Sequence, residues 1–183
     1  MGRDDTELIG RWRRGDSVAF EELVRRWQAP IGRVLARQLG RTEQVADLCQ
    51  EVFLRVYRAG PRYRESGAFS TWLYRIALNL ARDAARRRRK LRPLPDDLAQ
   101  VAPAESPCEQ RERIAAVSAA LADLPENLRE VLVLRHYEGL SFEQIARILD
   151  TPASTLKSRF AAALDRMRTR LAREGWGTEE TDS

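Results

Sequence analysis

The residues with the clearest chemical potential form a short basic run near the end of the chain, at Lys157–Arg159. They follow a segment in which Ser141 and Gln144 have the spacing of a capping box and Pro152 interrupts the helical pattern. Two predicted helices joined by so short a turn, with cations in the first turns of the second, are typical of a DNA-binding helix-turn-helix. An ordinary amphipathic helical hairpin is the alternative. Ser154 is also predicted to cap the second helix. The residues predicted to contact DNA are Ser154, Thr155, Lys157, Ser158 and Arg159.

A second basic run lies in the middle of the chain, where seven of the eleven residues from Arg82 to Arg92 are Lys or Arg and one, Asp83, is acidic. Clustered cations without acidic partners repel one another, so phosphate groups are the expected counter-charge. A solvated helix end, favoured by the helix dipole, is the alternative.

Three aromatic residues, Phe69, Trp72 and Tyr74, precede this second run. Their rings could stack on the unpaired bases of a single strand. They could equally belong to a hydrophobic core, since Trp72 and Ile76 share one helical face.

The elements that must position these residues are predicted to be helical. Apolar residues recur at intervals of three and four over residues 17–39, 44–58 and 70–89, which predicts three helices around one core. Gly60 and Pro61 are predicted to end the second of them, and residues 62–69 to form a loop. The helical pattern resumes near Arg111. Pro125 is predicted to take the first position of a further helix that ends at Gly139.

The segment between the two helical halves has the composition of a linker. Four of the chain's eight prolines lie between residues 92 and 108, together with Asp96, Asp97 and Glu105. We therefore predict an all-α fold of two small helical domains joined by a Pro-rich linker, the second containing the helix-turn-helix. The last nine residues are predicted to be a disordered polar tail, in which Trp176 either packs on the last helix or contacts a partner.

Composition excludes several functional classes. A net charge of +5 and a pI near 9.7 indicate a polyanionic partner. With one histidine, His136, and no phosphate-binding glycine loop, we expect no enzyme, metal, cofactor or small-molecule substrate. Direct membrane insertion is not expected, because no apolar run approaches the ~20 residues needed to span a bilayer. The isolated Cys49 and Cys108 and the lack of a signal-peptide pattern predict a cytoplasmic protein with reduced thiols.

Three segments, in order along the chain, match motifs of one known family: DLCQEVFLRVYRA, FSTWLYRIALN and LPENLREVLVLRHYEGLSFEQIARILDTPASTLKSR. Over about residues 5–172 the chain resembles the extracytoplasmic-function (ECF) sigma factors of the sigma-70 family, which are dissociable promoter-recognising subunits of bacterial RNA polymerase. The resemblance implies a non-catalytic transcription initiation factor that directs core RNA polymerase to specific promoter DNA and helps to open it. It also implies control by an anti-sigma factor.

The resemblance implies that residues 5–92 bind the minus-ten promoter element and the polymerase clamp, and that 93–110 are the linker. It implies that residues 111–173 bind the minus-thirty-five element and the polymerase flap, and residues 174–183 are predicted to form the polar tail. Asp47, Gln50 and Glu51 match the polymerase-binding motif, with a solvated helix face as the alternative. The loop before Phe69 matches the segment that pockets a flipped base. The residues implied to contact the minus-ten element or assist strand opening are Tyr63, Arg64, Ser66, Phe69, Trp72, Arg75, Asn79, Arg86 and Arg87.

Two other functions fit part of the sequence. A stand-alone dimeric helix-turn-helix regulator explains the second half, but leaves Phe69–Arg92 and Asp47–Glu51 without a role. An adaptor that places basic helices on RNA or on an anionic membrane would bind irrespective of strand. A regulator should bind specific duplex DNA by itself, whereas a sigma factor should need core polymerase.

Overall fold

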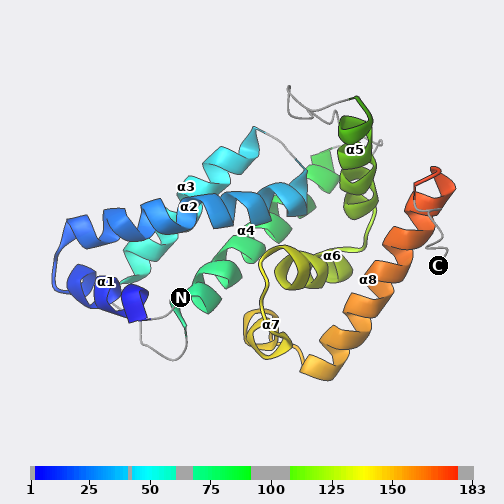
Figure 1. The fold of residues 1–183 in the computed structure, drawn as a ribbon. Helices are drawn as coiled ribbons and strands as arrows, with labels where there is room; N and C mark the ends of the chain where they lie inside the picture. The colour runs from blue at the N-terminus through cyan, green and yellow to red at the C-terminus, as the bar shows by residue number, and fades with distance from the viewer. Residues whose placement is uncertain (1–2, 41–42, 61–67, 92–107, 177–183) are drawn as a thin grey trace. The chain divides into compact units, whose positions relative to one another are not determined.

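The computed structural model describes residues 3–40, 43–60, 68–91 and 108–176, and every regular element within these ranges is a helix (Figure 1). The predicted all-α fold is confirmed. The chain divides into two compact units. The first comprises Met1–Pro93 with Arg147–Asp150, and the second comprises Leu94–Ala146 with Thr151–Ser183. Most of the predicted linker, the 62–67 part of the predicted loop and the end of the tail lie outside the described residues.

The first unit is built on α2 (Ser17–Leu39), α3 (Gln44–Ala59) and α4 (Phe69–Leu91), the three helices that the apolar spacing predicts. All three pack against one another, and α2 continues through Pro30. The stripe on α2 divides in two, because Leu23 and Ile31 are fully buried whereas Phe20 and Val24 are only half-buried. Other core residues of this unit are Val34, Leu35, Val52, Val56, Leu73, Ala77, Leu78 and Leu80.

A helix that the sequence analysis did not assign, α1 (Arg3–Arg13), packs against α2. The carboxylate of Asp5 is buried, accepting hydrogen bonds from Arg26 Nη1 at 2.7 Å and from Trp27 Nε1 at 3.2 Å. At the other end of α1, Asp16 forms an ion pair of 2.7 Å with Arg11 and caps α2. These two carboxylates attach both ends of α1 to α2.

The second unit contains α5 (Cys108–Ala122), α6 (Glu126–Leu132), the π-helical turn η2 (Val133–Tyr137), the first five residues of α7 (Phe142–Leu149) and α8 (Ala153–Arg173). Three details differ from the predictions. Helix α5 begins three residues before Arg111. Pro125 has ψ 142°, so it is the N-cap of α6 rather than its first helical residue. The helix also widens into the π turn before it ends near Gly139, whose φ is +68°. Core residues of this unit are Leu128, Val131, Leu134, Ile145, Leu156 and Ala163.

The capping box at the start of α7 is confirmed. The backbone N–H of Gln144 donates to Ser141 Oγ at 3.2 Å, and the backbone N–H of Ser141 donates to Gln144 Oε1 at 2.8 Å. At the far end of α8, Gly175 has φ +80° and the N–H of Trp176 donates to the Leu171 carbonyl, which terminates the helix. Trp176 is half-buried.

The Asp5→Ala variant should unfold the first unit more easily, because it leaves the buried indole N–H of Trp27 without its acceptor and removes the ion pair of Asp5 with the half-buried Arg26. We expect the free energy of unfolding to fall by roughly 1–3 kcal/mol in urea denaturation followed by circular dichroism. Glu7→Ala, an exposed acidic change on the same helix, is the control and should cost far less. Equal effects of the two variants would show that Asp5 does not hold α1.

Candidate nucleic-acid and partner interfaces

The start of α8 presents a polar surface around one buried anchor. Leu156 is fully buried, while the side chains on either side of it are exposed. Four of the five residues predicted to contact DNA are exposed and Arg159 is half-buried. We call the set Ser154, Thr155, Lys157, Ser158 and Arg159 the α8 surface. The structure therefore brings all five predicted residues together in the first two turns of one helix.

The predicted cap of α8 is wrong. Pro152 is the N-cap, with φ −56° and ψ 141°, and no side chain caps the helix. Its carbonyl accepts a hydrogen bond from the N–H of Leu156 at 3.1 Å, so the helix begins two residues earlier than a Ser154 cap would place it. Ser154 lies inside the first turn, where its carbonyl accepts a hydrogen bond from Ser158 Oγ at 3.3 Å. Its own side chain is exposed on the α8 surface.

The sequence analysis missed two residues that support Lys157. The ring of Phe142, the first residue of α7, lies 5.9 Å from the ring of Phe160. The Arg135 guanidinium is 5.2 Å and the Lys157 ammonium 6.0 Å from the Phe142 centroid, within the range of cation–π attraction. The signal that could have found Phe142 is its position directly after the Ser141 cap, on the helix that faces the basic run.

Glu143 belongs to the same cluster. The pKa of its carboxyl lies below the ordinary value, chiefly because its own backbone N–H and then Ser141 donate hydrogen bonds to it. The charges of Lys157 and Arg135 lower that pKa further. Glu143 is therefore a fixed negative charge beside the cations, which moderates an otherwise strongly positive surface.

In the first unit, α4 carries a polar face at intervals of three and four residues. We define the α4 face as Trp72, Arg75, Asn79, Arg82 and Arg86, which share one side of the helix. Trp72 is half-buried, and Arg75, Asn79 and Arg86 are exposed, as is the neighbouring Arg87. Arg82 Nη1 donates to Asn79 Oδ1 at 3.2 Å, and Arg86 pairs with Asp83 at the same distance.

Two of the aromatic side chains considered for base stacking are instead in the core. Phe69 and Tyr74 are each 4% exposed, with ring centroids 6.3 Å and 5.9 Å from that of Trp27. The first turn of α4 faces α2 at this point, so burial of these rings replaces exposure to a nucleic acid. The ring of Trp72 meets that of Phe69 edge to face, with the centroids 5.9 Å apart, and Trp72 is half-buried rather than in the core. Tyr63, Arg64 and Ser66 lie outside the described residues.

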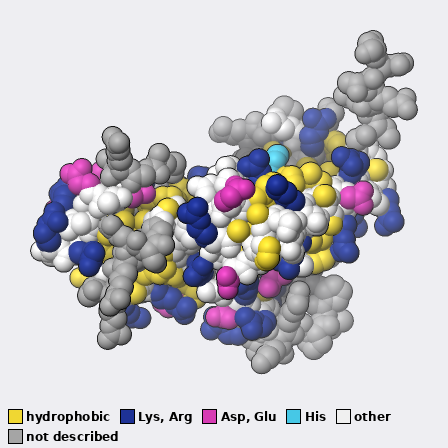
Figure 2. Space-filling model, turned by 90° about the horizontal axis from the view of Figure 1, so that it is seen from below, with side chains coloured by type: hydrophobic (Ala, Val, Ile, Leu, Met, Phe, Trp, Pro, Cys, Tyr) yellow, Lys and Arg dark blue, Asp and Glu magenta, His cyan; other side chains and the backbone are white. Residues whose placement is uncertain are grey.

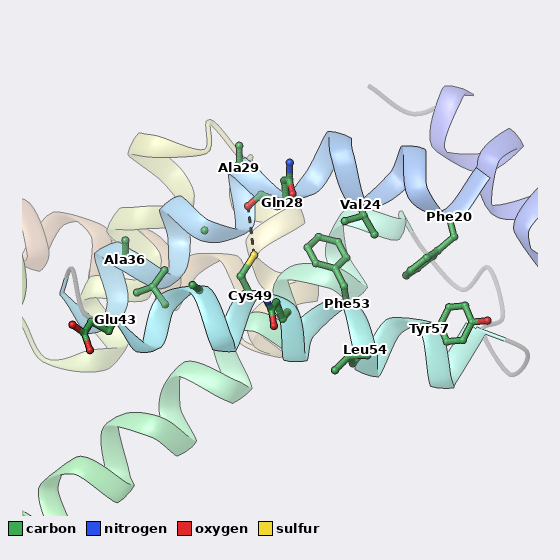
Figure 3. A pocket seen from close by; sticks show the side chains of 14 residues that line it. Phe20, Val24, Gln28, Ala29, Ala36, Glu43, Cys49, Phe53, Leu54 and Tyr57 are labelled. Carbon is green, nitrogen blue, oxygen red and sulfur yellow. Dashed lines mark hydrogen bonds between the residues drawn. The ribbon is translucent and has the colours of Figure 1, made fainter. Parts of the chain in front are cut away.

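The first unit also has a groove between two of its helices. A groove of about 1080 Å³ runs between α2 and α3, with predominantly apolar walls (Figure 3). Phe20 and Tyr57 lie at one end of this α2–α3 groove and Glu43 at the other. Leu54 and Tyr57 on its α3 wall are 48% and 56% exposed, which is unusual for large apolar side chains. The other lining residues are Val24, Gln28, Ala29, Gly32, Ala36, Val45, Ala46, Cys49, Gln50 and Phe53.

One of the three predicted polymerase-binding residues lies in this groove. Gln50 lines it, and both Gln50 and Asp47 are exposed on α3. Glu51 follows, and Arg55 Nε donates to its carboxylate at 2.8 Å, which holds the pKa of Glu51 below its ordinary value. The sequence motif therefore overlaps the groove at Gln50. The apolar wall from α2 was missed, because its residues belong to the same stripe as the core.

Basic side chains are spread widely over the surface. Figure 2 shows Lys and Arg over the face that it draws, with hydrophobic side chains reaching the surface between them. Among the described residues, no cluster of His, Cys, Asp and Glu could hold a metal ion. Within the same residues, no helix combines the length and apolarity needed to cross a bilayer.

The Cys49 thiol lies in the groove, 3.6 Å from the carbonyl oxygen of Gln28 (Figure 3). Burial raises the pKa of Cys49. Because the thiolate is the reactive form, a raised pKa displaces the alkylation rate profile to higher pH. In a Cys108→Ser background, iodoacetamide should react more slowly at pH 8 with the folded chain than with the urea-unfolded chain, and the folded rate should still rise beyond pH 9. Coincident folded and unfolded profiles would contradict this.

Comparison with known proteins gives a consistent result. Two family models match the chain, sigma-70 region 2 over residues 23–91 and sigma-70 region 4 over residues 114–167. The RNA polymerase sigma-H factor of Pseudomonas aeruginosa is 38% identical, in an alignment covering 93% of this chain and 96% of that protein. The ECF RNA polymerase sigma-E factor of Haemophilus influenzae is 34% identical, covering 91% of this chain and 95% of that protein.

Among solved structures, CnrH in complex with the cytosolic domain of CnrY has a TM-score of 0.74 with this chain. Sequence identity is 26%, and the match covers 93% of this chain and 99% of that one.

Proposed function

The chain belongs to the sigma-70 family, among the ECF RNA polymerase sigma factors, and we propose the surfaces through which it acts. As a member of this family it is an alternative sigma factor that takes part in transcription initiation. In our proposal it works in the cytoplasm without catalysing a reaction of its own. Residues 5–92 serve the minus-ten element and polymerase, 93–110 connect, 111–173 serve the minus-thirty-five element, and 174–183 are a tail.

The observation that carries the DNA-binding proposal is the α8 surface. Leu156 fixes the helix in the unit while the residues around it are exposed at the leading end of a helix-turn-helix, where such helices enter the major groove. Hydroxyl and cationic side chains can then meet base edges and phosphates. Phe142 supports Lys157 through its ring, which limits the positions that the ammonium explores.

For the minus-ten element we propose the α4 face. Trp72 offers a partly exposed ring on which an unpaired base can stack, and Arg75, Asn79 and Arg86 extend along the same side of the helix. Arg87 adds a phosphate contact. Phe69 has a supporting role in this proposal, because its buried ring packs against that of Trp72. Tyr63, Arg64 and Ser66, just before α4, remain proposed base-capturing residues.

For core polymerase we propose the α2–α3 groove and its rim. Apolar walls with an exposed Leu54 fit the apolar face of a partner helix. The carboxylates of Asp47 and Glu51 and the amide of Gln50 then meet its polar and basic flank. An anti-sigma factor that occupied the same groove would keep the chain from polymerase. CnrH was solved in complex with a second protein, the cytosolic domain of CnrY, and for this chain we propose an anti-sigma factor as the protein partner.

The first test is run-off transcription with purified chain, bacterial core polymerase and a fragmented library of genomic DNA. We expect specific start sites that a Lys157→Ala/Arg159→Ala variant loses by about tenfold or more, since each contact to a base or phosphate contributes about 1–3 kcal/mol. Arg168→Ala, an exposed cation on the same helix eleven residues beyond Lys157, is the control and should transcribe normally. No start sites, with tight duplex binding by the chain alone, would favour a stand-alone regulator.

The groove is tested separately by Leu54→Glu. A carboxylate in the apolar wall should weaken the affinity for core polymerase by about tenfold or more, because it must be desolvated against an apolar partner. Val18→Glu makes the same change at an exposed residue of α2 that does not line the groove, and it should bind normally. Affinity is measured by fluorescence anisotropy of labelled chain. Normal binding by Leu54→Glu would exclude the groove as the polymerase site.

A further inference from the structure

Gly60, at the end of α3, has no backbone reason to be glycine. Its φ of −51° and ψ of −44° are ordinary helical values that any residue adopts. The reason is spatial. A Cβ at this position would lie 2.1 Å and 2.2 Å from two ring carbons of Trp12, far inside van der Waals contact. The indole of α1 therefore occupies the space of the side chain that α3 lacks.

Trp12 belongs to a cluster of three rings contributed by three helices. It is 8% exposed, and its ring lies 4.9 Å from Phe20 on α2 and 6.3 Å from Tyr57 on α3. Phe20 and Tyr57 meet edge to face at 5.2 Å. The backbone N–H of Gly60 donates to the carbonyl of Tyr57, so the glycine and this ring belong to the same helical turn.

Phe20 and Tyr57 are also residues that line the α2–α3 groove, where their rings face each other at one end (Figure 3). Trp12 is not among the residues that line it. Its ring nevertheless contacts both of these groove rings. The position of α1 is fixed in turn by Asp5, bound to Arg26 and Trp27, and by the ion pair of Asp16 with Arg11.

We propose that Trp12 is a positioning residue that sets the shape of the aromatic end of the groove, with Gly60 as the space that admits it. Through Phe20 and Tyr57, α1 thereby determines which partner surface this end of the groove accepts. The inference rests on the proposed function of the groove as the polymerase-binding surface. It assigns to α1 a role in recognition although none of its residues lines the groove.

The test compares Gly60→Ala, Trp12→Leu and the double variant, each as the full chain, for affinity to core polymerase. Gly60→Ala should bind about tenfold more weakly, because the methyl group displaces the indole and with it the two groove rings. In the double variant the smaller leucine makes room for the methyl group. Its affinity should therefore exceed that of Gly60→Ala, although a second residue has been changed.

Stability alone is controlled by Val52→Ala. Val52 is a fully buried residue of α3 that does not line the groove, so this variant loses core packing without altering the rings. At a temperature where melting curves show every variant folded, it should keep the affinity of the unmodified chain. If Gly60→Ala does not fold, Trp12→Phe and Trp12→Leu replace it, and the loss of affinity should grow with the ring volume removed.

The outcomes separate the inference from the function on which it rests. Weak binding by Leu54→Glu together with normal binding by folded Gly60→Ala would overturn the inference and leave the groove as the polymerase site. A double variant no better than Gly60→Ala would also overturn it, since the effect would not pass through Trp12. Normal binding by Leu54→Glu would overturn the proposed groove function itself, and the inference with it.

Discussion

The position of α1 on the first unit depends on one buried carboxylate, that of Asp5. A helix of eleven residues such as α1 is marginal by itself in water, because nucleation is costly and few hydrogen bonds repay it. Asp5 makes its attachment specific, since a buried carboxylate is tolerated only where donors meet it, and Arg26 and Trp27 supply these donors. With Asp5 held in this way, the apolar side of α1 is buried in the unit through Leu8, Ile9 and Trp12.

Both units are built from helices, but they present different kinds of surface. The first uses long helices that leave a groove between two of them and a polar face on a third. The second uses short helices to hold the leading end of α8 outward, with Leu156 as its anchor. A chain that must engage polymerase and promoter DNA together needs binding surfaces of both kinds. Each of these surfaces is positioned by the buried residues of its own unit.

Sequence periodicity predicted the helices of the first unit well, because each carries a long stripe that one core must bury. It could not predict how α1 is attached, because Asp5 bonds to Arg26 and Trp27, which are separated from it by 21 and 22 positions in the sequence. It also could not divide the α2 stripe, in which Leu23 enters the core whereas Phe20 and Val24 line the groove, since both groups have the same spacing. Of the motif residues Asp47, Gln50 and Glu51, Gln50 lines the groove. The burial of Phe69 and Tyr74 follows from tertiary packing against Trp27, which spacing along α4 does not reveal.

The π turn at Val133–Tyr137 contains one more residue than an α-helical turn in the same place would. In it the N–H of Glu138 bonds to the carbonyl five residues back, so the ladder contains one residue more than an α-helix needs. Removing one residue there would restore α-helical bonding while α6 and α7 kept their own hydrogen bonds. The wide turn therefore accommodates one residue more than α-helical geometry allows between α6 and α7, while the backbone N–H of Glu138 keeps a hydrogen-bond partner.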